Sequence, residues 1–154
     1  MLIAIRIAIA LFSLNSIAVA RDDDPKVEIV KIRLQPVKIE KEDSELRKLQ
    51  KERFNLSIEV VKGIIPRFYE GTEVCRVFVE AQQRMIAAGL DFETDPKARV
   101  ALLEEGVRLA KITEVLSKSE FDAGKARDWN VAFASYARAD AEIRLLKEKD
   151  AKRK

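Results

Sequence analysis

The chain has 154 residues, of which 36% are charged and 47% hydrophobic, and its formal net charge is +3. With 29 basic and 26 acidic residues interleaved, it lacks the basic surface that nucleic-acid binding requires. It contains no His and one Cys, which removes the commonest general base and metal ligand and excludes an internal disulfide. We therefore expect no nucleic-acid partner, no cofactor, no metal site and no enzymatic activity.

Residues 1–20 are typical of an export signal. Arg6 supplies the positive start, residues 7–14 form a short apolar core, and Ala18-Val19-Ala20 is a cleavage site of small residues. Cleavage would leave a mature chain beginning at Arg21, located in the periplasm or cell envelope or secreted. The alternative is an uncleaved membrane anchor, but the apolar run is shorter than the roughly 20 residues that a spanning helix needs. After cleavage we expect no integral membrane segment.

Residues 21–43 are expected to form an extended or disordered arm. We interpret Asp22-Asp23-Asp24 as solvated charge, because the glycine turn and distal glutamate of a calcium loop are missing. Residues 27–39 alternate partly between β-branched and polar side chains, as an edge strand does. However, Pro36 removes a hydrogen-bond donor, and no second strand candidate is present. The favoured interpretation is an extended tether lying on the helices or in a partner's groove.

From residue 44 onward the pattern is helical, and we expect one helical domain over residues 44–149. Ser44 is a plausible N-cap for the first helix. Gly63 and Pro66 are expected to end or kink this helix, with a connection at residues 70–72. Its apolar positions recur at three- and four-residue steps with a gap at Arg53; they are Leu46, Leu49, Leu56 and Val60.

A second helix is predicted to follow and to close at Gly89 or at Leu90-Asp91. Its apolar residues at helical spacing are Val74, Phe78, Ala81, Met85 and Ala88. The single cysteine, Cys75, lies in this helix and is either buried or available for an intermolecular disulfide. Its apolar neighbours favour burial.

Thr94-Asp95-Pro96 is the clearest helix start, because a capping residue precedes a proline at the first helical position. The helix is expected to run unbroken to about Asp122. Its apolar residues fall on two adjacent faces, which predicts two neighbouring helices. One face holds Val100, Leu103, Val107 and Ala110, and the other Leu102, Leu109, Ile112 and Leu116.

The last helix is predicted from about Arg127 to Lys147, and residues 150–154 form a basic tail. Ala123-Gly124-Lys125 is expected to be a reverse turn, which makes the last two helices antiparallel. The alanines of the last helix let neighbouring backbones approach closely. The expected fold is therefore an all-α antiparallel bundle of about four helices with a coiled-coil-like C-terminal hairpin.

Residues 98–146 resemble the helical hairpin of the outer-membrane efflux (TolC-like) family. The resemblance is carried by Phe121-Asp122-Ala123-Gly124 before the turn and by the alanine-rich run WNVAFASYARADAEIRLL after it. The chain also resembles short exported TolC-like helical proteins of unknown function. It has one copy of the hairpin and no outer-membrane barrel strands, so the resemblance implies a coiled-coil hairpin of the cell envelope and not a pore.

Trp129, Phe133 and Tyr136 form an aromatic stripe at helical spacing. The favoured interpretation is that the rings wedge the open end of the hairpin against the first helix, since such aromatics usually pack inward. The alternative is a docking edge for a partner. The residues that we expect at a partner-binding surface are Val107, Leu116, Gly124, Trp129, Phe133 and Tyr136.

Carboxylates in the helices have ordinary explanations. Glu104 and Glu105 are adjacent on a helix and do not converge on one substrate, so interfacial salt bridges are the expected role. Asp140 is interpreted as a half-buried partner of an arginine or as a residue that sets the register of a coiled coil.

Three functional classes follow. The favoured one is an exported helical interaction or structural module of the cell envelope, acting by packing against partner helices or a second copy. The second is a periplasmic accessory of an efflux or secretion apparatus, in which the hairpin tip around Gly124 makes the contact. The third is a small enzyme or ligand carrier with a pocket between helices.

Overall fold

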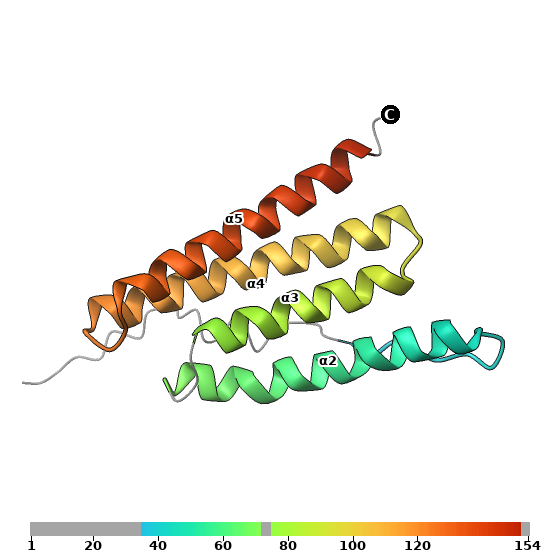
Figure 1. The fold of residues 1–154 in the computed structure, drawn as a ribbon, viewed down its shortest axis with the longest axis horizontal. Helices are drawn as coiled ribbons and strands as arrows, with labels where there is room; N and C mark the ends of the chain where they lie inside the picture. Colours follow the sequence, from blue (N-terminus) through green and yellow to red (C-terminus); the bar gives the residue numbers. More distant parts are fainter. Residues whose placement is uncertain (1–34, 72–74, 152–154) are drawn as a thin grey trace, which may run out of the picture.

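The computed structural model describes residues 35–71 and 75–151. Within these ranges the chain forms four α-helices and no strands (Figure 1). They are α2 (Glu45–Tyr69), α3 (Cys75–Phe92), α4 (Pro96–Asp122) and α5 (Asp128–Ala151). Successive helices run antiparallel, and α3 packs against each of the other three. The expected all-α bundle is confirmed.

Several sequence-based predictions fall on residues that the structure does not describe. These are the export signal, the acidic start of the arm, the edge-strand or tether segment up to residue 34, Thr72, Val74 and the last three residues of the tail.

The predicted helix starts are confirmed by their capping geometry. The backbone N–H of Arg47 donates to the Ser44 side chain at 3.3 Å, and that of Ala98 donates to Asp95 Oδ2 at 2.9 Å. Pro96 occupies the first turn of α4, where its missing N–H would have no intrahelical partner. Local side-chain chemistry therefore fixes both boundaries.

The turn between α4 and α5 is a Schellman motif. Gly124 has φ +69°, a left-handed conformation that glycine adopts without strain. Its N–H donates to Phe121 O at 2.8 Å, and the N–H of Lys125 donates to Glu120 O at 2.8 Å. The predicted reverse turn and antiparallel hairpin are confirmed.

Several predicted helix ends need correction. Gly63 and Pro66 do not end α2, which continues to Tyr69, because a proline in the last turn removes only one backbone hydrogen bond. The connection then begins at Glu70, as expected. α5 continues to Ala151, past the expected end at about Lys147. α3 continues past Gly89 to Phe92. Gly89 is buried, and a Cβ there would lie 3.0 Å from the Phe54 ring and 3.1 Å from Leu102. This glycine allows three helices to approach closely and does not end one.

The core lies between α2, α3 and α4 and is closed on one side by α5. The predicted apolar positions Phe78, Ala81, Met85 and Ala88 of α3 are buried, and Cys75 is 4% exposed, which confirms the preference for burial. α4 contacts both α3 and α5, so the two neighbouring helices predicted from its two apolar faces are present. Two aromatic pairs fill the core: Phe68 with Phe78, and Phe54 with Phe92.

The apolar residues that predict α2 are not those that bury it. The buried residues follow a separate row with steps of three, four or seven residues; they are Lys51, Phe54, Ile58, Val61 and Phe68. Leu46, Leu49, Leu56 and Val60 are each more than half exposed. The two rows are offset by two residues, or about 200° around the helix, so they lie on opposite sides. α2 therefore has a second apolar side that faces away from the bundle.

Buried polar side chains connect α3 and α4. Gln82 donates to Thr113 Oγ1 at 3.0 Å, and Thr113 donates to the carbonyl of Leu109 at 2.9 Å. One helical layer away, Ser117 donates to Cys75 Sγ at 3.3 Å. Because an unpartnered polar group in the core is costly, these pairs fix the register of the two helices.

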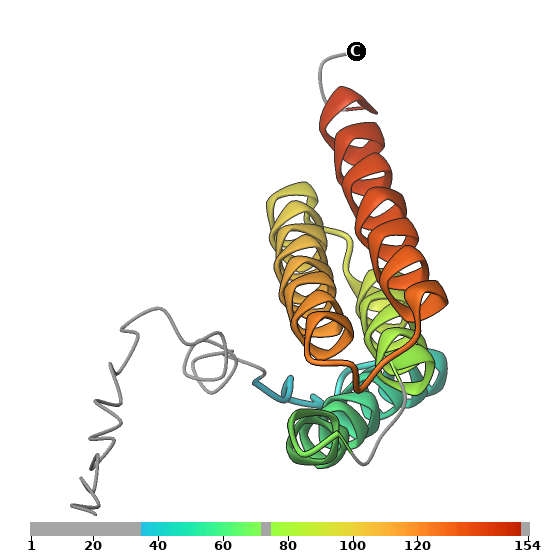
Figure 2. The ribbon, with the colours of Figure 1, turned by 90° about the vertical axis from the view of Figure 1, so that its left-hand side faces the viewer.

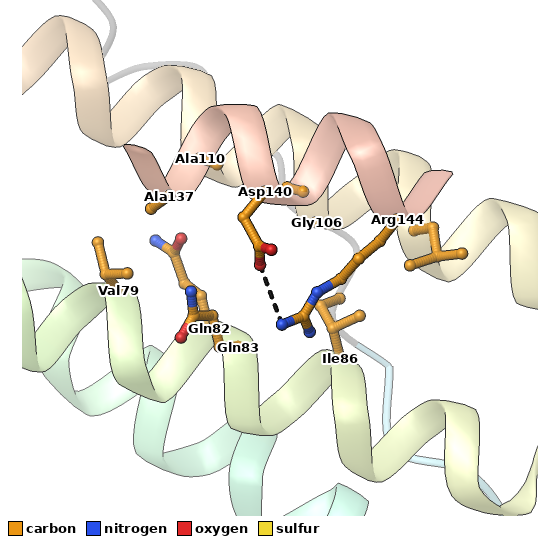
Figure 3. Close-up of a pocket in the computed structure, with 11 residues that line it drawn as sticks. Val79, Gln82, Gln83, Ile86, Gly106, Ala110, Ala137, Asp140 and Arg144 are labelled. Carbon is orange, nitrogen blue, oxygen red and sulfur yellow. Dashed lines mark ion pairs between the residues drawn. The ribbon is translucent and has the colours of Figure 1, made fainter. Parts of the chain in front are cut away.

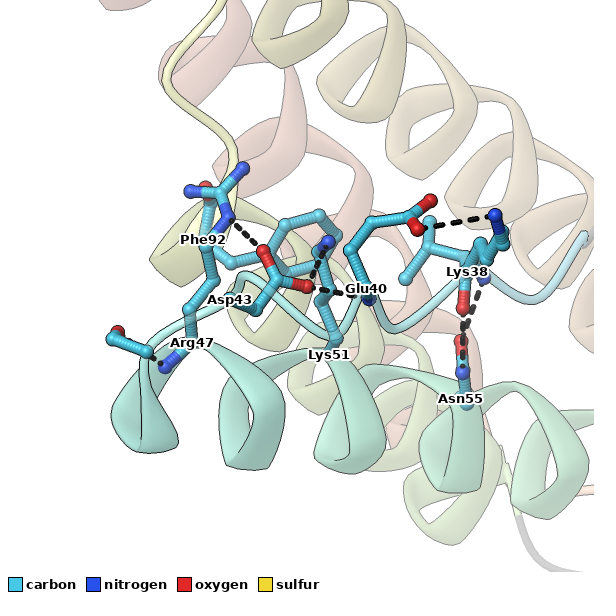
Figure 4. A network of polar contacts seen from close by, with 9 residues as sticks. Lys38, Glu40, Asp43, Arg47, Lys51, Asn55 and Phe92 are labelled. Carbon is cyan, nitrogen blue, oxygen red and sulfur yellow. Dashed lines mark hydrogen bonds and ion pairs between the residues drawn. The ribbon is translucent and has the colours of Figure 1, made fainter.

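The described part of the arm, residues 35–43, lies along α2 (Figure 4). The Asn55 amide donates to Val37 O at 2.9 Å and accepts from Val37 N at 2.8 Å, as a neighbouring strand would. Asp43 closes the segment: its carboxylate pairs with Lys51 and Arg47 and accepts from the N–H of Glu40. Hydrogen bonds from Lys51 and from the Glu40 backbone hold the pKa of Asp43 below its ordinary value.

The α4–α5 hairpin opens away from its turn (Figure 2). Near the turn α5 contributes the buried small residues Ala134 and Ala137. Toward its C-terminal end, α5 diverges from α4, and ion pairs bridge the two helices. These pairs are Arg138 with Glu114, Lys111 with Glu142, Arg99 with Glu148 and Lys149 with Glu104.

Candidate docking surfaces

The outer side of α5 carries a continuous row of apolar residues. Positions 129, 132, 136, 139, 143 and 146 alternate steps of three and four residues, which is the heptad pattern of a coiled coil. We name this row the α5 seam; it consists of Trp129, Ala132, Tyr136, Ala139, Ile143 and Leu146. The four large side chains are exposed by 49%, 66%, 50% and 60% in chain order. The buried residues Ala134 and Ala137 lie on the opposite side of the helix.

The interpretation of the aromatic stripe as a wedge is wrong for two of its three rings. Phe133 packs partly against the core, but Trp129 and Tyr136 point outward and are half exposed or more. Trp129 also lies in the first turn of α5, at the closed end of the hairpin and not at its open end. The reason is that alanines, not aromatics, supply the tight contact with α4, so the rings remain outside.

The other residues expected at a partner surface lie apart from the α5 seam. Val107 and Leu116 are 9% and 8% exposed on the inner side of α4, so they present no free surface for a partner. Gly124 is exposed at the hairpin turn. Of the six expected residues, Trp129 and Tyr136 are brought onto one surface.

Sequence reasoning missed the C-terminal half of the α5 seam. Ile143 and Leu146 extend the row that Trp129 and Tyr136 begin, and Ala132 and Ala139 fill the intermediate positions. Trp129, Tyr136 and Ile143 are spaced seven residues apart, and this heptad spacing would have indicated the full seam. The aromatic stripe drew attention to Phe133, which belongs to the neighbouring face.

The second apolar side of α2 has the same period. We name it the α2 seam: Leu46, Leu49, Arg53, Leu56 and Val60. Arg53 interrupts the row and forms an ion pair with Asp91 of α3. One edge of the seam is acidic at every heptad, with Glu45, Glu52 and Glu59 spaced seven residues apart. Two outer helices thus each present a heptad row to solvent.

A small cavity lies where α5 diverges from α4 (Figure 3). Its volume is about 40 Å³, and its walls are mainly apolar, with Gly106, Ala110 and Ala137 close to α3. Asp140 and Arg144 form a 2.9 Å ion pair at its edge. This confirms one of the two roles expected for Asp140, that of a half-buried partner of an arginine. Because small-molecule sites are about 300 Å³ or larger, this cavity is too small for a cofactor.

A larger groove of about 390 Å³ lies between α2, α3 and α4, beside Gln35, where the described chain begins. Its walls are mostly core residues such as Phe54, Ile86 and Leu102. Its acidic members offer no reactive pair: Glu105 is held by Arg108 of its own helix at 2.8 and 3.0 Å. The groove therefore has apolar walls without a convergent set of catalytic groups.

Two side chains that could carry chemistry, Glu104 and Cys75, are held in structural contacts. Glu104 pairs with Lys149 across the hairpin, whereas Glu105 pairs with Arg108 of its own helix, so interfacial salt bridging is confirmed for Glu104 and not for Glu105. Burial raises the pKa of the Cys75 thiol, and the hydrogen bond from Ser117 only partly offsets this. A buried thiol with a raised pKa is a poor nucleophile. Within residues 35–71 and 75–151, no three potential ligands cluster as a metal site would require.

In the described part of the chain, no helix combines the length and apolar character needed to cross a membrane. No family model, curated protein or solved structure matches the chain. The function must therefore be argued from the molecule's own surfaces.

Proposed function

We propose that the protein is an exported helical interaction module of the cell envelope that acts by packing its outer helices against partner helices, without catalysis. The observation that carries this proposal is the pair of exposed heptad seams on α2 and α5. A helix of a self-contained bundle needs one apolar side, and a continuous exposed apolar row is the usual mark of a protein contact.

The period of the seams favours helices as partners. Apolar residues at alternating three- and four-residue steps keep one line along the helix, and a second helix with the same period interdigitates with it. A flat or irregular partner would not require this period over the length of α5. Small residues at positions 132 and 139 leave room for large side chains of the other helix.

The efflux-accessory alternative has less support from the fold. In it the hairpin tip around Gly124 would make the contact. The C-terminal end of α2 and the first residues after it lie beside that tip: Phe68, Tyr69 and Gly71 border the same surface pocket as Ala123 and Lys125. The tip therefore does not stand clear of the bundle, as a docking tip should.

Site-specific photocrosslinking in the producing cells tests the proposal. A benzophenone amino acid at Leu56 or Tyr136 would probe the two seams, with Arg84 on the exposed side of α3 as the control position. We expect crosslinked protein adducts from at least one seam and none from the control. Absence of adducts from both seams, with the variants folded and exported, would refute the interaction function.

A further inference from the structure

We propose that the α5 seam is the site of self-association, where α5 of one copy packs antiparallel against α5 of a second copy in a two-fold symmetric dimer. The inference rests on the proposed function and names the occupant of one of its two seams. It depends on three properties of α5: the order of large and small residues, the charges beside them and the apolar area that the seam exposes.

The order of side-chain sizes makes the seam complementary to itself in the antiparallel direction. When two copies are aligned so that Trp129 of one faces Leu146 of the other, Ala132 faces Ile143, and Tyr136 faces Ala139. Each alanine then lies opposite a large side chain, as close packing requires. Because the pairing is reciprocal, the six positions fill six layers, and the interface closes after two copies.

Parallel pairing loses this match. It places each residue opposite its own copy, so the two Tyr136 rings would meet in one layer and the two Ala139 side chains would leave a gap in the next. Both kinds of layer are unfavourable, because overpacking and voids each destabilise a packed core.

The charges beside the seam also favour the antiparallel direction. Asp128 and Lys149 occupy the same edge at opposite ends of α5. Antiparallel pairing brings Asp128 next to Lys149 of the second copy, twice by symmetry, whereas parallel pairing leaves these two residues at opposite ends of the dimer. Lys149 keeps its 2.7 Å contact with Glu104, because an ammonium group has three donors.

The α2 seam lacks this self-complementarity. In an antiparallel pair equivalent edges meet, so Glu52 of one copy would lie near Glu59 of the other. Arg53 would also enter the seam and give up its pairing with Asp91. Of the two seams, α5 is therefore the one that a second copy fits.

The exposed area supports a dimer of modest affinity. Trp129, Tyr136, Ile143 and Leu146 are each about half exposed or more, and together the seam residues offer on the order of 500 Å² per copy. The total of about 1,000 Å² is at the lower end of specific protein interfaces, and we expect a dissociation constant on the order of micromolar.

Sedimentation equilibrium of the purified protein tests self-association. We expect a reversible monomer–dimer equilibrium that Tyr136→Arg weakens at least tenfold. Val115→Arg on α4 is the matched control, because Val115 is also an apolar residue more than half exposed and lies outside the seam, and it should leave the equilibrium unchanged. Circular dichroism of both variants establishes that the helices are intact.

Cysteine crosslinking tests the direction of pairing. The double variant Ala132→Cys with Ile143→Cys should oxidise to a covalent dimer, whereas each single variant should not, because equivalent positions are about 16 Å apart in the antiparallel pair. The wild-type chain supplies the background, since its cysteine is buried. Covalent dimers from the single variants would mean parallel pairing and would overturn the inference.

Two further outcomes would overturn it: a monomer at concentrations far above the micromolar range, or a series of species larger than a dimer, which indicates pairing of unlike surfaces. In either case the photocrosslinking experiment still decides the proposed function, because adducts with other proteins do not require a dimer.

Discussion

Single polar residues decide the register of the core. Gln82 and Thr113 are both buried, and their 3.0 Å hydrogen bond gives an N–H of the Gln82 amide an acceptor inside the bundle. The hydrophobic pattern of α3 and α4 defines which sides meet, but it tolerates a slip of one turn. The polar pair does not, because the slip would leave buried donors without acceptors.

We expect Thr113→Val to lower the free energy of unfolding by about 1–3 kcal/mol, because the amide of Gln82 would lose its acceptor in the core. Chemical denaturation measures the difference. The double variant with Gln82→Leu should recover part of the loss, since replacing both partners removes the unsatisfied group. Wild-type stability in Thr113→Val would contradict a role for the pair.

The second prediction at the residue scale concerns Asp43 and pH. Its folded-state pKa lies below the ordinary value of 3.8, chiefly because Lys51 donates to it. The resulting stabilisation is therefore fully present above that value and is lost as pH falls through the lower folded pKa. We expect Asp43→Asn to be less stable than wild type at pH 7. The difference should vanish in strong acid, as measured by thermal denaturation across pH; a difference that persists there would point to a role independent of charge.

Individual elements show why some features could be predicted from sequence and others could not. Caps are local: Ser44, Asp95 and Gly124 act on backbone groups within a few residues, so their patterns were sufficient. Burial is not local. α2 has two apolar rows, and the visible row of leucines is outside, whereas the buried row includes Lys51, whose charge is satisfied by the arm. The periodicity of the sequence could not show which of the two rows is buried, because that depends on where the neighbouring helices and the arm pack.

The same limit applies to the candidate site. Trp129 and Tyr136 could be selected from their spacing, but their exposure depends on Ala134 and Ala137, which let α4 approach on the other side. Val107 and Leu116 were selected for the same apolar character and proved to be core. Apolar residue type alone does not distinguish a core residue from a docking residue.

Replacing two glycines of different helical elements by alanine is expected to change the stability of the protein in opposite directions. Gly63 lies inside α2, and a Cβ at this position would have no neighbour within 4 Å among the described residues outside its own turn of helix. Gly63→Ala should therefore stabilise the protein by about 0.5–1 kcal/mol. Gly124 has φ +69° in the hairpin turn, so Gly124→Ala should destabilise it by about 1 kcal/mol. Denaturation of both variants under one set of conditions is the measurement, and the same sign for both would contradict the assigned backbone roles.

The whole molecule combines one well-packed side with outward apolar rows on its two outer helices. α3 contacts the other three helices, α4 is held between α3 and α5, and α2 and α5 each expose their second side. The all-α class and the hairpin could be predicted from composition, caps and the glycine turn. The arrangement of the outer helices could not, because it depends on which of several apolar faces the bundle buries.

Export is the prediction at the scale of the whole chain. If residues 1–20 act as a cleaved signal, the protein recovered from the cell envelope should begin at Arg21, with a mass lower than that of the full chain by those residues. Intact-mass spectrometry with N-terminal sequencing measures this, and changing Ala18 and Ala20 to bulky residues should block processing. Recovery of the chain with Met1 still attached would contradict cleavage.

The leucines on the outer side of α2 have a consequence for how much of the protein a cell can hold. An uncovered leucine row can adhere to other exposed apolar surfaces, and this tendency grows with concentration. If a partner helix covers the row, as we propose, supply of the chain has to keep pace with supply of that partner. Copies made in excess would then be prone to precipitation or degradation, so the abundances of the two proteins are expected to be matched.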